Sequence, residues 1–312
     1  MQINRFTLVW SLIHIALLLM VFTPLGLIGA SLLMTPIVVQ SVKLKPGVFS
    51  MVFAGNVILT GLAAALLGWA GAGFVAMLLA LFFLIPSLVM GMMYKRQTAA
   101  HSVLIAGVVT ILAQLLLLLL ILYSFGYNVT TYVKQGLTES MTMAESVMNM
   151  NIPQESIDTL IRTVSQTIPL YLILFSVFYV VVTHAVSRYA LQKSGETIAG
   201  LKPMREWKLP KSLVWYYLIA LLASFIVTDP DSVISVMLLN LIPLLMLAFA
   251  VQAASLLFFA ADVKQWSRSW IIVLLIVLGM VILVIPPLLQ IIALIGVFDV
   301  AFPLRDRLKK SK

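Results

Sequence analysis

Ten apolar runs divide this sequence, and each approaches the length needed to cross a lipid bilayer. An α-helix rises about 1.5 Å per residue, so about 20 apolar residues span the roughly 30 Å hydrocarbon core of a membrane. With 62% of its residues hydrophobic and only 10% charged, the chain has too little polar surface for a soluble domain of its size. The sequence therefore predicts an all-α, polytopic transmembrane helical bundle. The runs are 7–23, 24–41, 47–69, 74–94, 101–123, 168–187, 213–228, 233–260, 269–285 and 288–302.

Basic residues indicate how these runs are oriented, because Lys and Arg are enriched in the cytoplasmic loops of membrane proteins. If the N-terminus lies inside and every run crosses, all but two of the 20 basic residues fall on the inner side. The two exceptions are Lys134 and Arg162. Acidic residues dominate the outer loops instead. We therefore expect eight to ten membrane segments with both termini cytoplasmic. The outer acids are Glu139, Glu145, Glu155, Asp158, Asp229 and Asp231.

The runs at the two ends allow two interpretations, because residues 7–41 and 269–302 each contain proline near the middle. Each is either a pair of short crossings or one long kinked helix. Proline lacks a backbone N–H and disrupts a helix, so Pro24 and the pair Pro286–Pro287 suit a turn. Only paired crossings keep the basic tail RDRLKKSK on the inner side. We predict a proline-broken hairpin at each end.

One acid, Asp299, interrupts the last apolar run. If that run starts after Pro287, Asp299 lies near the inner end of the crossing, where a charge needs a partner. We expect Arg305, or a basic residue of another inner loop, to pair with it. A structural anchor is favoured over a catalytic or proton-carrying role.

Two polar segments lie between the runs, and the rest of residues 1–312 is predicted to form a single integral membrane domain. Residues 124–167 carry apolar side chains at helical spacing and are predicted to form an extracytoplasmic insertion of two amphipathic helices. This insertion is either a cap that only packs or a lid over an external pocket. Residues 188–212 form a basic cytoplasmic loop, in which Trp207 suits the membrane interface and Pro210 a helix start.

Several function classes lack the residues they need. The chain has no cysteine, and its three histidines share no metal-binding spacing, so no metal or other cofactor is expected. Its basic residues lie in short loops between apolar runs, which orients a membrane protein and does not indicate nucleic-acid binding. No phosphate-binding loop is present. No acid pair or nucleophile–base pair can be assembled, so no enzyme activity is expected.

Polar residues inside membrane spans are costly and are the first candidates for function. Four of them are candidate substrate-binding residues: Asn56, Gln114, Asn240 and Gln252. The alternative role is an interhelical hydrogen bond, which we favour for Asn56 because Gly55 and Gly61 allow close helix packing nearby.

Two short motifs resemble those of the YybS family of uncharacterised bacterial multi-pass membrane proteins. They are EWKLP (Glu206–Pro210), before a late span, and GVFDVAFPLR (Gly296–Arg305), at the end. Gly296, Asp299 and Arg305 match the family's terminal motif. Ala301, Pro303 and Leu304 stand where the family often has Trp, Asp and Phe.

That family is remotely similar to the S-components of energy-coupling-factor vitamin importers, which are six-helix proteins with cytoplasmic termini. The resemblance implies small-molecule uptake in a bacterial cell membrane, with energy from a partner module of a transmembrane coupling subunit and ATPases. Besides that module and an unidentified ligand, the expected partner is the lipid bilayer. The alternative function is a non-transporting scaffold or regulator of the bacterial envelope. A ligand-sized cavity near Asn240 and the 124–167 insertion would favour uptake, whereas a tightly packed bundle would favour the scaffold.

Overall fold

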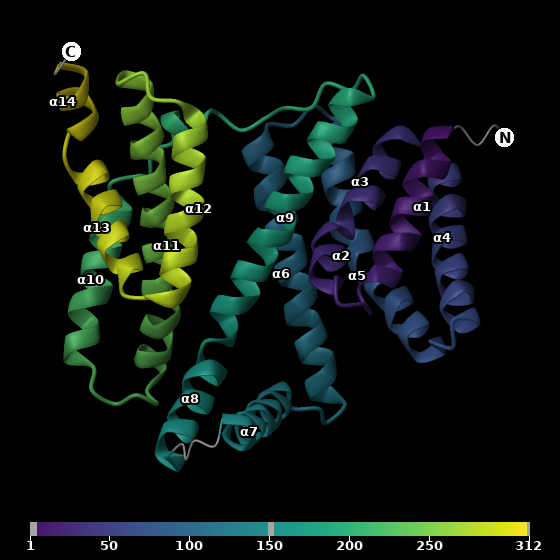
Figure 1. Cartoon of the computed structure of the whole chain (residues 1–312), viewed down its shortest axis with the longest axis horizontal. Helices are drawn as coiled ribbons and strands as arrows, with labels where there is room; N and C mark the ends of the chain where they lie inside the picture. The colour runs from purple at the N-terminus through teal and green to yellow at the C-terminus, as the bar shows by residue number, and fades with distance from the viewer. Residues whose placement is uncertain (1–4, 149–152, 311–312) are drawn as a thin grey trace. The chain divides into compact units, whose positions relative to one another are not determined.

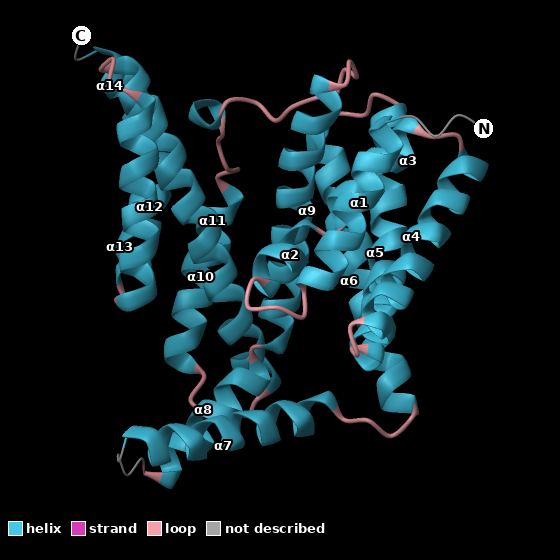
Figure 2. Cartoon of the chain, turned by 45° about the vertical axis from the view of Figure 1, so that its right-hand side comes forward, coloured by secondary structure: helices cyan, strands magenta, loops and turns pink. Residues whose placement is uncertain are grey.

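The fold is known from a computed structural model, which describes residues 5–148 and 153–310. All regular structure in these residues is helical, and none of them forms a strand (Figure 2). The chain divides into two compact units (Figure 1). Unit 1 comprises Met1–Val129 and Tyr171–Gly200, and unit 2 comprises Thr130–Leu170 and Leu201–Lys312.

Unit 1 is a bundle of six apolar segments, of which five are long enough to cross a membrane and α1 is shorter. Two short helices, α2 and α3, share one of these segments. Pro36 has no N–H to donate to the carbonyl of Leu32, and the helix is interrupted at Leu33. The helices are α1 (Arg5–Met20), α2 (Gly26–Leu32), α3 (Met34–Lys43), α4 (Pro46–Leu66), α5 (Ala70–Lys95), α6 (Ala100–Ser124) and α9 (Ile168–Lys193), of which α9 starts in unit 2.

The N-terminal proline turn reverses the chain, so residues 7–41 do not form one long kinked helix. After α1 ends, the Thr23 hydroxyl donates to the Met20 carbonyl at 2.7 Å, and α2 starts at Gly26. A Cβ on Gly26 would overlap the carbonyl oxygen of Val21, so the tight turn needs glycine there. Helices α2 and α3 then run back along α1.

The core of unit 1 combines aliphatic and aromatic side chains from six of its helices, α1, α3, α4, α5, α6 and α9. The Phe83 and Tyr179 rings of α5 and α9 stack with their centres 4.8 Å apart. Helices α6 and α9 approach closely because Gly107 faces Val180, where a Cβ would crowd the valine methyl groups.

Unit 2 contains four apolar helices and several shorter elements. Its longest helix, α11, continues through Pro243 and contacts all the other apolar helices of the unit. The elements are α7 (Val129–Met148), α8 (Gln154–Gln166), the 3₁₀ turn η1 (Met204–Glu206), α10 (Ser212–Ile226), α11 (Val233–Val263), α12 (Arg268–Val284), α13 (Leu288–Ala301) and α14 (Leu304–Lys310).

The C-terminal proline pair ends α12 and starts a second helix, as the hairpin prediction requires. Backbone N–H groups of Leu288 and Leu289 donate to the carbonyls of Ile285 and Pro286, both at 3.0 Å, closing the turn. Helix α13 then packs mainly against α11 and only lightly against α12. Gly296 makes this close approach possible, because a Cβ there would overlap the backbone carbonyl of Phe249.

The polar insertion folds as two helices on either side of Pro153, as its spacing predicts. Helix α8 buries Ile157 and Ile161, whereas Met143 and Val147 of α7 stay exposed. Helix α7 runs across the direction of α11 (Figures 1 and 2). The loop predicted at residues 188–212 is shorter than expected, because α9 continues to Lys193 before the chain leaves the helix.

The predicted all-α membrane fold is confirmed. Six helices of the described residues are long and apolar enough to cross a membrane, and four apolar helices of 10–17 residues supply the remaining runs. The six are Gly26–Lys43, Pro46–Leu66, Gly71–Lys95, Ala100–Ser124, Ile168–Lys193 and Val233–Val263. The cytoplasmic placement of the termini and the single-domain organisation of residues 1–312 stay predictions.

Candidate functional site

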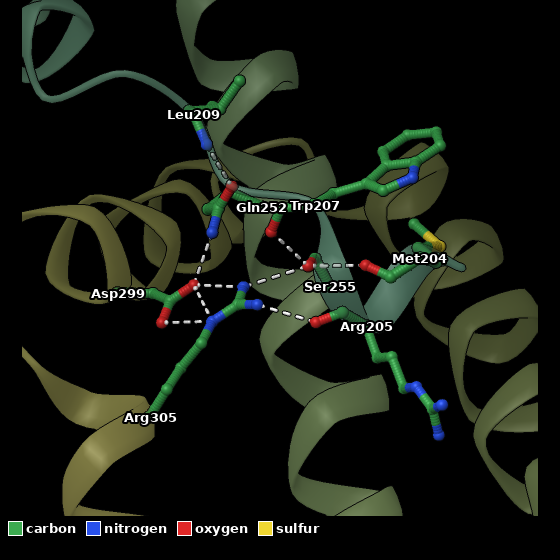
Figure 3. A network of polar contacts seen from close by, with 8 residues as sticks. All are labelled: Met204, Arg205, Trp207, Leu209, Gln252, Ser255, Asp299 and Arg305. Atoms are coloured by element: carbon green, nitrogen blue, oxygen red, sulfur yellow. Dashed lines mark hydrogen bonds and ion pairs between the residues drawn. The ribbon is translucent and has the colours of Figure 1, made fainter. Parts of the chain in front are cut away.

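A buried ion pair in unit 2 joins the last two helices. Asp299 of α13 has a fully buried side chain, and the Arg305 guanidinium of α14 donates to its carboxylate at 2.7 Å and 3.1 Å (Figure 3). The Gln252 amide of α11 donates to the same carboxylate at 2.5 Å. The predicted pairing of Asp299 with Arg305 is thus confirmed, and its third member is Gln252.

The same network holds the loop before α10. Arg305 donates to the carbonyl of Arg205 at 2.7 Å and to the Ser255 hydroxyl at 3.0 Å. Ser255 lies within hydrogen-bond distance of the carbonyls of Met204 and Trp207, and Gln252 accepts from the Leu209 N–H at 2.9 Å (Figure 3). We call Gln252, Ser255, Asp299 and Arg305, with loop residues 204–209, the anchor network.

The anchor network brings the two sequence motifs together. Residues of EWKLP contribute backbone groups, and GVFDVAFPLR contributes the ion pair. The side chains of Gln252, Asp299 and Arg305 all have partners within the network, which buried polar groups require. The arrangement is suited to holding the loop against α11 and α13, with no polar group left over for a ligand.

Unit 1 has a separate polar cluster, in which Asn56 meets two residues that the candidate set did not include. Its amide nitrogen lies 3.4 Å from His14 Nδ1 and 3.5 Å from Gln40 Oε1, and Gln40 also donates to Ser11 at 3.1 Å. The side chains of His14, Gln40 and Asn56 are buried. These contacts join α1, α3 and α4, which is the interhelical role favoured for Asn56.

The other two candidates lie apart from these clusters. Gln114 of α6 donates to the Phe82 carbonyl of α5 at 3.1 Å. Asn240 of α11 joins the end of α8 to the start of α9, because it donates to the Gln166 carbonyl and accepts from the Leu170 N–H, both at 2.8 Å. The structure therefore does not bring the four candidate substrate-binding residues together.

A polar crevice of about 580 Å³ lies where α7, α8 and the start of α11 meet in unit 2. Gln166, held by Asn240, forms part of its wall and donates to Asp231 at 3.0 Å. None of the four candidate residues lines it. The lining residues are Thr130, Lys134, Thr138, Asp158, Ile161, Arg162, Ser165, Gln166 and Asp231.

Charges of both signs face this polar crevice. Arg162 lies 3.8 Å from Asp231, too far for a tight ion pair, and both side chains are well exposed. Lys134 comes from α7 and Asp158 from α8. The sequence analysis singled out Asn240 and the 124–167 insertion, which lie near the polar crevice, but it did not single out the charged side chains that line it. One feature of the sequence could have identified two of them. Lys134 and Arg162 are the two basic residues that the charge distribution assigns to the outer side.

No group of three or more His, Asp or Glu residues that could hold a metal ion occurs in the part of the chain that the structure describes. The polar crevice is instead lined by hydroxyl, amide and mixed charged groups, which can hold a small polar molecule by hydrogen bonds and ion pairs.

Several apolar helices of membrane length, each of which satisfies its own backbone hydrogen bonds, define a multi-pass helical membrane protein. The chain belongs to the family described as "Predicted membrane protein (DUF2232)", whose family model matches residues 11–300. It is similar to the uncharacterized protein YybS of Bacillus subtilis (strain 168), with 22% identity over 227 residues, which cover 70% of this chain and 72% of that protein. No solved structure matches the chain. The predicted YybS-like membership is confirmed, whereas the likeness to S-components stays a prediction.

Replacing Asn240 by Ala should loosen the junction of α8 and α9. The variant loses its side-chain hydrogen bonds to three backbone groups, and we expect a cost of about 1–3 kcal/mol. Hydrogen exchange should accelerate around residues 166–170 while α12 and α13 stay protected. Gln290→Ala, at an exposed position of α13, is the matched control. Equal exchange at the junction in both variants would contradict the role assigned to Asn240.

Proposed function

We propose that this chain is a component of a bacterial plasma membrane that binds a small polar molecule with an anionic group and takes part in its uptake. The polar crevice is the proposed binding site. Its volume of about 580 Å³ lies within the usual range of small-molecule sites, roughly 300–1,000 Å³. The proposal includes no chemical reaction.

One observation carries this proposal. Lys134 and Arg162 are the only basic residues that charge segregation assigns to the outer side, and both line the same crevice from different helices. Basic residues orient a membrane protein from the cytoplasmic side, so this function does not explain two cations on the outer side. Binding of an anionic ligand does explain them. Two cations can hold a carboxylate or phosphate by charge-assisted hydrogen bonds.

The orientation of the site is part of the proposal. Helix α11 has 31 residues and therefore extends for about 45 Å, with Asp231 just before its start and the anchor network in its second half. The polar crevice and the basic loop 202–209 thus lie towards opposite ends of α11. With the basic loop inside, the crevice opens to the outside, where a substrate for uptake arrives.

Energy for uptake is proposed to come from a partner protein, because the sequence has no phosphate-binding loop. The partner would be an energy-coupling-factor module, as the resemblance to S-components implies. Unit 1 has six apolar segments, five of membrane length and the shorter α1, and this number supports this part of the proposal because S-components have six helices.

Ligand retention tests the proposed site. The full chain is purified gently, and the small molecules that come with it are identified by mass spectrometry. Replacing Arg162 by Gln, or Lys134 by Gln, removes one charged contact to the ligand's anionic group. We expect retention to fall about 10- to 100-fold in each variant, the usual effect of losing a hydrogen bond to a charged group.

Lys208→Gln is the matched control, because Lys208 is an exposed basic residue in the loop held by the anchor network. It should retain the ligand fully. Equal amounts of the small molecule in all three variants would place the ligand elsewhere. Folded protein that retains no small anion would contradict the proposal and favour the non-transporting scaffold.

A further inference from the structure

A second crevice, of about 380 Å³, lies between apolar helices of unit 2. We call it the apolar crevice. Its walls come from α11, α12 and α13, and Leu308 of α14 lies at one end. All its lining residues are apolar, and among them Ala250, Ala254, Ala260 and Gly279 leave the space that larger side chains would fill. A Cβ added to Gly279 would meet nothing within 4 Å.

Light packing of α12 explains why the space is present. The opposite face of α12 carries exposed apolar side chains, such as Val273 and Val277, which in a membrane contact lipid. The side chains that line an empty apolar space lack dispersion contacts on that side. An apolar occupant supplies these contacts and so stabilises the packing of the three helices. The membrane around α12 offers acyl chains as the nearest occupant.

The chemistry of the crevice fits an acyl chain. Such a chain is apolar along its length and flexible enough to follow an irregular space between apolar side chains. A lipid also carries a headgroup at one end, which suits a crevice with apolar walls and charged residues at one mouth.

Basic residues gather at the α14 end of the apolar crevice. Arg307 and Lys309 flank Leu308 on α14, and both are exposed. Lys264 follows the last residue of α11 and lies four residues after Ala260. Asp306 is the one acid of α14, so cations predominate there. Each Lys or Arg near a membrane surface attracts anionic lipid by about 1 kcal/mol.

From this combination we propose that the apolar crevice is a binding site for one anionic phospholipid. An acyl chain fills the space between α11, α12 and α13, and Arg307, Lys309 and Lys264 hold the phosphate of the headgroup. The ion pair of Asp299 with Arg305 fixes the start of α14, so that these cations stay at the mouth of the crevice. This lipid site is independent of the proposed uptake function and of the polar crevice.

Native mass spectrometry of the full chain tests this site, with phosphatidylglycerol or phosphatidylcholine added to the detergent-purified protein. We expect the wild-type protein to retain one phosphatidylglycerol in preference to phosphatidylcholine. The double variant Arg307→Gln/Lys309→Gln should retain phosphatidylglycerol less well, by about fivefold for each charge removed, with phosphatidylcholine unaffected. These surface substitutions leave the bundle interior unchanged, so they do not threaten folding.

Gly279→Leu fills the apolar crevice and should lower the retention of both lipids by about threefold or more, because packing contacts of the acyl chain are lost. Gly55→Leu is the matched control, since Gly55 of α4 also has open space around its Cα position. Equal retention of the two lipids by the wild-type protein, or unchanged retention in Gly279→Leu, would overturn the proposal. A photoreactive group at Leu278 that cross-links to protein instead of lipid would assign the crevice to a partner helix and overturn it as well.

Discussion

Replacing Asp299 by Asn should destabilise unit 2 by about 3–5 kcal/mol, because it leaves the Arg305 guanidinium largely buried without a countercharge. Asn is nearly the size of Asp, so the loss is electrostatic and not a packing defect. The same change weakens the hold on the 204–209 loop, since Arg305 also bonds to Arg205 and Ser255. Thermal unfolding in detergent and the yield of folded protein measure the effect.

Two further variants test whether the loss of stability comes from breaking the buried ion pair or from removing any acidic residue of this region. Asp306→Asn removes an exposed acid from the same short helix and should stay within about 0.5 kcal/mol of the wild-type protein. The double variant Asp299→Asn/Arg305→Gln has no buried unpaired charge and should lose less stability than Asp299→Asn alone. A double variant that is clearly less stable than Asp299→Asn would show that the isolated charge is not the cause.

Replacing Gly296 by Ala should separate α13 from α11 and lower folded yield strongly. The added methyl group would overlap the backbone carbonyl of Phe249, and a backbone atom cannot rotate away as a side chain can. Overpacking in a core costs about 1–3 kcal/mol and more where the backbone must move. Gly296 also lies three residues before Asp299, so a shift of α13 would strain the anchor network. Thermal unfolding of the detergent-solubilised protein measures the loss.

Gly279→Ala is the matched control for this prediction. It also places a methyl group on a glycine within an apolar helix of unit 2, but in open space. We expect stability equal to that of the wild-type protein or higher by up to about 1 kcal/mol, because alanine favours helix more than glycine does. Equal losses in the two variants would mean that helical glycines matter for flexibility and not for close packing.

Much of the fold was predictable from the sequence, because its signals are local. A transmembrane helix satisfies all its backbone hydrogen bonds within one apolar run, so each run predicts its own helix. Pro24 and the pair Pro286–Pro287 mark turns for the same local reason. The pairing of Asp299 with Arg305 was also predictable, since the two residues are six positions apart in the chain.

The candidate site was less predictable, because it depends on residues far apart in the sequence. Gln252 meets Asp299 across 47 residues, and Ser255 meets Arg305 across 50. Asn240 was singled out as polar within a span, but its part in joining α8 to α9 depends on partners 70 and 74 residues away. Polarity within a span shows that a residue needs a partner, and does not say which one.

By itself, the sequence determined a helical membrane protein with ten apolar segments, reversed by proline near each end, because hydropathy and backbone hydrogen bonding act within a single segment. Only the tertiary structure decided which polar groups meet. It joined the two family motifs in one anchor network, and it placed Lys134 and Arg162 at one crevice. Such contacts depend on how the helices pack, and packing is set by side-chain shape at close approaches such as Gly296 against Phe249.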